Sequence, residues 1–142
     1  MFSEKEIKLS EIEIAKSAED YRAAEILFQN QVYSSALNRL YYSIFHLICA
    51  RLDLDGLGFS KHSAVVAKFR ELYLNKDFDS NIKTKLSNII KEAEDLRNKS
   101  DYEKGFYADE DTTRKTFEDV TFFRGTVLEY INNLIKTRGG TS

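Results

Sequence analysis

The 142-residue chain contains no proline. Because proline removes a backbone donor and breaks helix interiors, a chain without it can form long uninterrupted helices. Apolar residues recur along five segments at steps of three and four, the spacing that places them on one face of a helix. No alternating strand pattern of useful length is present in the sequence. The sequence therefore predicts an all-α fold.

The five predicted helices are residues 10 to about 30, about 35 to 52, 60 or 62 to 74, 80 to 97, and about 110 to 135. Ser10 and Glu13 have capping-box spacing at the first start, and Asp79 or Ser80 can cap the fourth helix. The acidic run 109–111 suits the start of the fifth helix. These segments predict a single domain over residues 1–142, an up-down bundle of four main helices plus a short one. Its expected core is about 10–136, between short flexible ends.

Composition narrows the classes of function. The formal net charge is −2, so the chain has no global basic surface for wrapping nucleic acid, and any such contact must be local. The single Cys49 cannot form an internal disulfide. The most apolar run, residues 41–50, is too short to cross a bilayer, and no secretion signal is visible. We therefore expect a cytoplasmic protein with no membrane contact.

The second predicted helix carries unusual side chains opposite its apolar stripe. Arg39, Tyr42, His46 and Asp53 share that face, where a surface helix would normally place Lys and Glu. This pattern predicts that another helix or a partner chain covers the face. For His46 the favoured interpretation is a packed, hydrogen-bonded histidine, and ligand binding is the alternative.

The segment Arg97 to Tyr102 places a cation, a carboxylate and a phenol where the fourth stripe ends. Arg97 can neutralise the terminal carbonyls of its helix, or it can present a planar fork of donors to a phosphate. Its position alone favours the first interpretation. The two histidines lie on different elements and no metal-binding pair shares a helix face, so we expect neither a metal nor a cofactor.

Three blocks of sequence together resemble the HEPN (higher eukaryotes and prokaryotes nucleotide-binding) family. They are residues 38–46 (Asn-Arg-Leu-Tyr-Tyr-Ser-Ile-Phe-His), Lys61-His62-Ser63 leading to Phe69, and residues 97–102 (Arg-Asn-Lys-Ser-Asp-Tyr). More narrowly, the chain is similar to the small bacterial and archaeal branch whose late motif ends in Asp-Tyr. The resemblance covers roughly residues 10–136. It implies a helical bundle, a homodimer, and a cleft near the end of the fourth helix.

Many members of that family are metal-independent endoribonucleases, often toxins paired with a small nucleotidyltransferase antitoxin. Their motif is an arginine followed, after four to six residues, by a histidine. Arg97 matches the arginine, but positions 102–104 hold Tyr102, Glu103 and Lys104. Tyrosine, with a pKa near 10, donates a proton well but is a poor base at neutral pH. The retained residues therefore suit phosphate binding better than cleavage.

The leading hypothesis is a dimeric module that binds a nucleotide or RNA phosphate through Arg97 and acts with a nucleotidyltransferase-type partner. Asp101 would orient the guanidinium, Tyr102 would stack on the ligand, and Arg39 and His46 would complete the binding set. One alternative is a weak ribonuclease that uses Arg97, Asp101 and Tyr102, helped by His46. The other is a purely structural dimer in which Arg97 and Asp101 form an ordinary ion pair.

Overall fold

The computed structural model describes residues 1–58 and 61–139, and within these ranges every regular element is a helix. The elements are α1 (Glu4–Gln29), α2 (Tyr33–Leu54), α3 (His62–Phe69), a π-helical turn η1 (Arg70–Leu74), α4 (Asn75–Asp77), α5 (Ser80–Tyr102) and α6 (Glu110–Arg138). The predicted all-α bundle, with four long helices and a short third one, is confirmed. None of these described helices combines the length and apolar character needed to span a bilayer.

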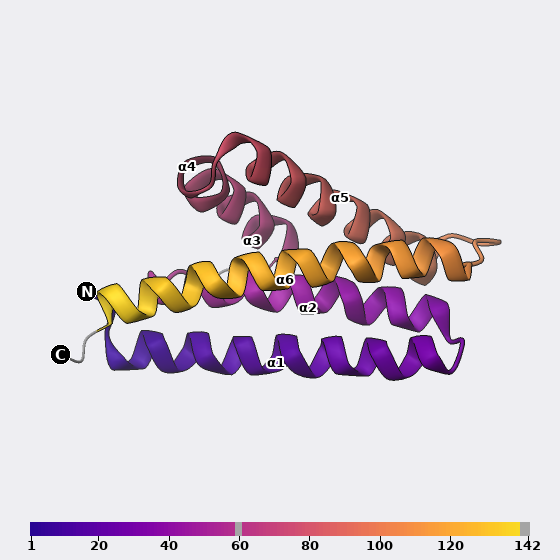
Figure 1. Cartoon of the computed structure of the whole chain (residues 1–142), viewed down its shortest axis with the longest axis horizontal. Coiled ribbons are helices and arrows are strands. Elements are labelled where there is room, and N and C mark those ends of the chain that lie inside the picture. The colour runs from indigo at the N-terminus through magenta and orange to yellow at the C-terminus, as the bar shows by residue number, and fades with distance from the viewer. Residues whose placement is uncertain (59–60, 140–142) are drawn as a thin grey trace.

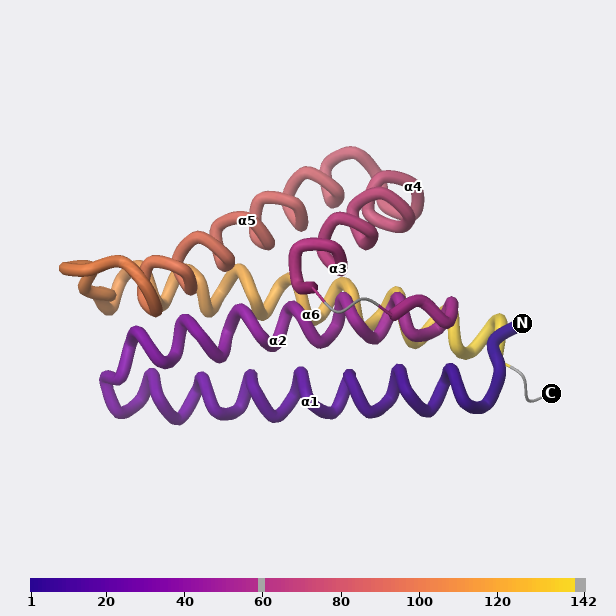
Figure 2. The backbone as a smooth tube through the Cα atoms, turned by 180° about the vertical axis from the view of Figure 1, so that it is seen from behind, coloured from indigo at the N-terminus to yellow at the C-terminus, as the bar shows by residue number. Residues whose placement is uncertain are grey.

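Helix α2 occupies the centre of the bundle and packs against α1, α3, α5 and α6. Helices α1, α2 and α6 run side by side along the long axis, whereas α5 crosses them at an angle and converges on α6 at one end (Figures 1 and 2). At the other end the start of the chain meets the end of α6, because the Phe2 amide donates to the Arg138 carbonyl oxygen at 2.8 Å.

The core is formed mainly by the predicted apolar stripe of α2. Leu37, Tyr41, Ile44 and Ile48 are all buried, and burying each such side chain stabilises the fold by about 1.5–3 kcal/mol. On the adjoining edge of α2, the small residues at positions 36, 43 and 50 are also fully buried and allow α1 to approach closely. Most of the fold therefore depends on α2.

The first helix begins earlier than the sequence predicted. Ser3 is the N-cap of α1, and Ser3 and Glu6 form a reciprocal capping box with distances of 3.1 and 2.9 Å. Ser10 is instead buried inside the helix. Both serines have a glutamate three residues later, but only the upstream pair adjoins Phe2, which the end of α6 holds in place. The prediction of a start at Ser10 was therefore wrong.

The fourth predicted helix, α5, runs on to Tyr102 rather than ending at Arg97. Its last turn is stabilised by an i,i+4 ion pair between Arg97 and Asp101 and by a hydrogen bond from Asn38 of α2 to Asp101. The start at Asp79 is confirmed, as is the acidic start of α6, where Asp109 is the N-cap. One alternative start predicted for the short helix, Ser60, lies outside the described residues; α3 begins at His62.

Candidate functional site

Arg97 lies on the face of α5 that packs against α2. Its Nη2 donates to the Tyr42 hydroxyl at 2.7 Å, its Nη1 donates to Asn98 Oδ1 at 2.8 Å, and its Nε lies 3.4 Å from Asp101 Oδ2. The side chain is only 16% exposed, and within the described residues no main-chain carbonyl accepts a hydrogen bond from it. Arg97 is therefore a packed residue one turn inside α5. The interpretation that its position favoured, neutralisation of the terminal carbonyls of its helix, was wrong.

Three tyrosine rings surround this guanidinium. Its central carbon lies 5.3 Å from the ring centroids of Tyr41 and Tyr42, and 5.9 Å from that of Tyr102. Burial disfavours the charge on Arg97, but the contacts with Tyr42, Tyr102 and Asp101 outweigh it and raise the pKa of the guanidinium above its ordinary value. The side chain is thus a fixed, permanent cation. Tyr102 is 76% exposed, so one of the three rings faces solvent.

Asp101 and Arg39 are joined through Asn38. The Asn38 amide donates from Nδ2 to Asp101 Oδ2 at 3.0 Å, while its oxygen accepts from Arg39 Nε at 3.0 Å. Arg39 also donates from Nη1 to Asp20 of α1 at 2.9 Å and lies over the Tyr42 ring at 5.1 Å. The structure therefore brings Arg39, Asp101, Arg97 and Tyr102 together, with Arg39 already paired.

His46 is held between two carboxylates of α1. Its Nδ1 lies 2.6 Å from Glu13 Oε2, and its Nε2 lies 3.4 Å from Asp20 Oδ2. Burial raises the pKa of Glu13, but the hydrogen bond and charge of His46 outweigh that and hold it below its ordinary value. The face of α2 that carries His46 is covered, as predicted, and the cover is α1 of the same chain. This geometry favours the interpretation of His46 as a packed, hydrogen-bonded histidine.

Three residues of this site were not singled out from the sequence as binding groups: Asn38, His62, and Tyr42 as the acceptor for Arg97. His62 is an exposed residue at the start of α3, and its ring centroid lies 4.0 Å from that of Phe45 and 5.7 Å from that of Tyr42. Burial, together with the charges of Arg97 and His46, lowers the pKa of His62 below its ordinary value. The sequence did contain one feature that could have identified them: all three residues lie in the sequence blocks that carry the family resemblance.

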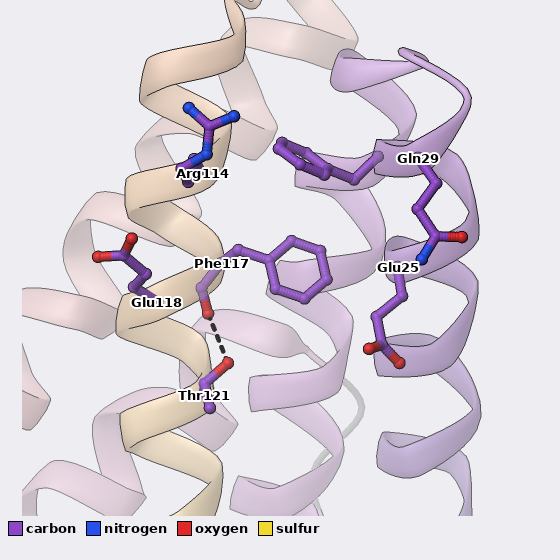
Figure 3. Close-up of a pocket in the computed structure, with 7 residues that line it drawn as sticks. Glu25, Gln29, Arg114, Phe117, Glu118 and Thr121 are labelled. Carbon is purple, nitrogen blue, oxygen red and sulfur yellow. Dashed lines mark hydrogen bonds between the residues drawn. The ribbon is translucent and has the colours of Figure 1, made fainter.

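A hollow of about 450 Å³ lies between α1 and α6, separate from the Arg97 site (Figure 3). Its apolar surface comes from Phe28 and Phe117, and Figure 3 shows Glu25, Gln29 and Arg114 around it. Its lining residues form none of the hydrogen bonds, ion pairs or ring contacts described for Arg97, and they include charges of both signs. A phosphate needs converging donors, so the Arg97 region is the better candidate site.

Comparison with known proteins gives matches over most of the chain. A model of the HEPN domain matches residues 10–133. A protein of Methanocaldococcus jannaschii named a "putative toxin" is 38% identical over 91 residues, which cover 64% of this chain and 64% of that protein. A second "putative toxin" of the same organism is 29% identical over 90 residues, covering 63% and 59% of the two chains. A Thermotoga maritima protein named "UPF0332 protein" is 43% identical over 51 residues, covering 36% and 39%. The matched segments thus span less than two thirds of each relative's length.

Proposed function

Because this chain belongs to the HEPN domain family, we propose that it is a toxin-like module that binds a nucleotide or RNA phosphate through Arg97. The observation that carries the proposal is the guanidinium held by Tyr42 and Asp101 beside the exposed ring of Tyr102. Two relatives, each named a "putative toxin", support the toxin-like part of this proposal. Arginine presents a planar fork that matches phosphate oxygens, and a neighbouring exposed ring can stack on a base.

Asp101 competes with a phosphate for Arg97, but the competition is weak. Its contact with Arg97 is a single one at 3.4 Å rather than a bidentate pair. Asp101 also accepts a hydrogen bond from Asn38, so it keeps a partner when a phosphate approaches the guanidinium. We propose that Asp101 positions the free arginine and gives way to a phosphate, whose oxygens can accept from two guanidinium donors at once.

A second candidate function is a weak metal-independent ribonuclease, and one observation favours it. His62 contacts the same Tyr42 ring that Arg97 reaches, and its lowered pKa leaves the imidazole neutral at pH 7 and able to accept a proton. His46 is less suited to this role because both its nitrogens face carboxylates. Binding remains the leading proposal, because Tyr102 stands where the histidine of the family's motif is expected.

The binding proposal is tested by replacing Arg97 with alanine. We expect the affinity for a single-stranded oligoribonucleotide to fall by at least about 1.5 kcal/mol, or more than tenfold, because a charge-assisted contact is lost. Fluorescence anisotropy at low salt measures the change. Arg97 is packed against Tyr42, so some stability will also be lost, and each variant needs a thermal melt to establish that it is folded at the assay temperature.

Tyr42→Phe is the matched control, since it removes the hydroxyl that holds Arg97 but keeps both the ring and the positive charge. Its affinity should lie between those of the wild type and Arg97→Ala. Unchanged affinity in folded Arg97→Ala would instead favour an ordinary structural ion pair. Cleavage of single-stranded RNA in EDTA that is lost in both Arg97→Ala and His62→Ala would establish the ribonuclease in place of the binding module.

We propose further that the module is a homodimer and acts with a nucleotidyltransferase-type antitoxin. Since α1 covers the polar face of α2, that face gives no support for a dimer. The support comes from the Arg97 site itself. One arginine offers few contacts to a ligand, whereas two copies of this chain would form a shared cleft with an arginine from each. Tyr102 and Tyr107, which are 76% and 84% exposed, leave aromatic surface at the same end of the bundle.

Light scattering at micromolar concentration should therefore give twice the monomer mass, because a second copy would bury this aromatic surface. Tyr107→Lys should shift the mass toward the monomer, whereas Tyr33→Phe, a change at a partly buried tyrosine, should not. A monomer that persists at high protein concentration would refute the shared cleft.

A further inference from the structure

Helix α2 begins without a side-chain cap. Its N-cap is Val32, whose side chain cannot accept a hydrogen bond, and its first turn contains no acidic residue. The other long helices α1, α5 and α6 are capped by Ser3, Asp79 and Asp109. The first amides of a helix have no partner within it and carry a partial positive charge, which at α2 no side chain offsets.

A hollow of about 290 Å³ lies beside this helix start. Ser34, Ser35, Asn38 and Arg39 of α2 line one side of it, and the remaining lining residues are Leu27 of α1 and Ser100 and Asp101 of α5. The hollow thus adjoins the Arg97 site through Asp101, the carboxylate that Arg97 and Asn38 share. Its lining offers hydroxyl, amide and guanidinium donors.

Unpartnered polar atoms give an independent indication of a ligand. In the part of the chain that the structure describes, three buried side-chain polar atoms lack a hydrogen-bond partner: Ser10 Oγ, Arg97 Nε and Ser100 Oγ. Buried polar atoms in folded proteins are nearly always paired, so each such exception needs a reason. Arg97 Nε still has its ion pair with Asp101 at 3.4 Å, so the exception that bears on this hollow is Ser100, which lines it. An oxygen-rich ligand in this hollow would give the Ser100 hydroxyl its missing partner.

We propose that this hollow binds a second phosphate of the strand whose neighbouring phosphate lies at Arg97. The inference rests on the proposed function of the Arg97 site, and it identifies the ligand class as a single-stranded oligonucleotide rather than a free mononucleotide. The start of α2 supplies partial positive charge, and Arg39, although paired with Asp20, offers further N–H donors. The carboxylate of Asp101 opposes an anion; Arg97, 3.4 Å away, offsets its charge in part, and Asn38 donates a hydrogen bond to it. The two sites are about one helical turn apart on α5, roughly 5.4 Å, which neighbouring phosphates of a strand can span.

The test is Ser35→Asp, measured with two probes: uridine monophosphate and hexauridylate. Ser35 is exposed in the first turn of α2, where a carboxylate favours the helix and repels a phosphate in the hollow. We expect the affinity for hexauridylate to fall about tenfold while that for the mononucleotide stays unchanged. The slope of log affinity against log salt should fall by about 0.7, the value for one phosphate of a single strand. The melting temperature should stay the same or rise.

Two matched variants complete the design. Ser80→Asp places the same carboxylate at the exposed start of α5, twenty residues from Ser100 and about 30 Å away along the helix, and should change neither affinity. Arg97→Ala should weaken the binding of both probes. If Ser35→Asp folds poorly, Ser34→Asp in the same turn replaces it with the same expected result.

The outcomes distinguish the claim of a second phosphate in the hollow from the claim that Arg97 binds a phosphate. If Ser35→Asp binds hexauridylate with wild-type affinity and salt slope, there is no phosphate in the hollow. If it weakens both probes equally, the hollow and Arg97 form one site, and the second phosphate is refuted. If Arg97→Ala leaves both affinities unchanged, or if the wild type binds neither probe, the proposed function fails, and this inference fails with it.

Discussion

Replacement of Arg51 by alanine will lower the free energy of unfolding by about 3 kcal/mol. Arg51 is 3% exposed, yet it is charged, and its side chain joins three elements. Its Nε donates to the Tyr130 hydroxyl at 2.8 Å, its Nη1 donates to Asp55 at 3.3 Å, and its guanidinium lies 3.8 Å from the Tyr73 ring centroid. Breaking a buried ion pair costs about 3–5 kcal/mol, and the lower end applies because the Asp55 side chain is 38% exposed and can be hydrated.

Urea unfolding measures this loss. Arg114→Ala is the control, because Arg114 also contacts two acidic residues but its side chain is 49% exposed, so the change should cost less than about 1 kcal/mol. Arg51→Met restores much of the lost volume without the charge and should be less destabilising than Arg51→Ala. If Arg51→Ala proves as mild as Arg114→Ala, the contacts of Arg51 contribute little to the joining of α2, η1 and α6.

Introduction of leucine at Ser43 will cost about 2–3 kcal/mol of stability through overpacking. Ser43 is fully buried where α1 and α2 pack, and Ser17 Oγ of α1 donates to the Ser43 carbonyl oxygen at 2.6 Å. The two backbones are therefore too close for a side chain with about two more non-hydrogen atoms, since a packed interior has no free volume to accept them.

The matched control is Ser43→Ala, which removes the hydroxyl but keeps the small size, and it should cost about 1 kcal/mol or less because only one hydrogen bond, to Leu40, is lost. Thermal and urea unfolding followed by circular dichroism distinguish the two variants. Equal stability of the alanine and leucine variants would mean that the α1–α2 interface can separate at little cost, contrary to its close packing here.

Local sequence patterns predicted much of the fold. The stripe of α2 and the caps at Asp79 and Asp109 depend on residues within one or two turns of each other, so periodicity and capping rules identify them. The two misplaced helix ends depend on distant contacts. The last turn of α5 is held by Asn38, which is 63 residues away from Asp101, and the start of α1 is held by the end of α6.

The candidate site was predictable only in part, for the same reason. The Arg97 segment could be recognised from its residue types and from the family resemblance, but its acceptor Tyr42 lies 55 residues away on another helix. His46 could be assigned to a covered face, whereas its partners Glu13 and Asp20 required the register between α1 and α2. The uncapped start of α2 was not predicted, because the sequence placed this helix start at about residue 35, whereas the helix begins at Tyr33 directly after Val32.

A relay of polar contacts runs from the site into α1. Asp101 contacts Asn38, Asn38 contacts Arg39, and Arg39 contacts Asp20, which also lies beside His46. The outer side of α1 leaves Leu9, Ile12 and Ile26 between 43% and 52% exposed. A protein that bound this outer side and displaced α1 would withdraw Asp20 from Arg39 and disturb Asn38 and Asp101 in turn. The binding proposed for Arg97 would therefore depend on the position of α1 as well as on the residues of α5.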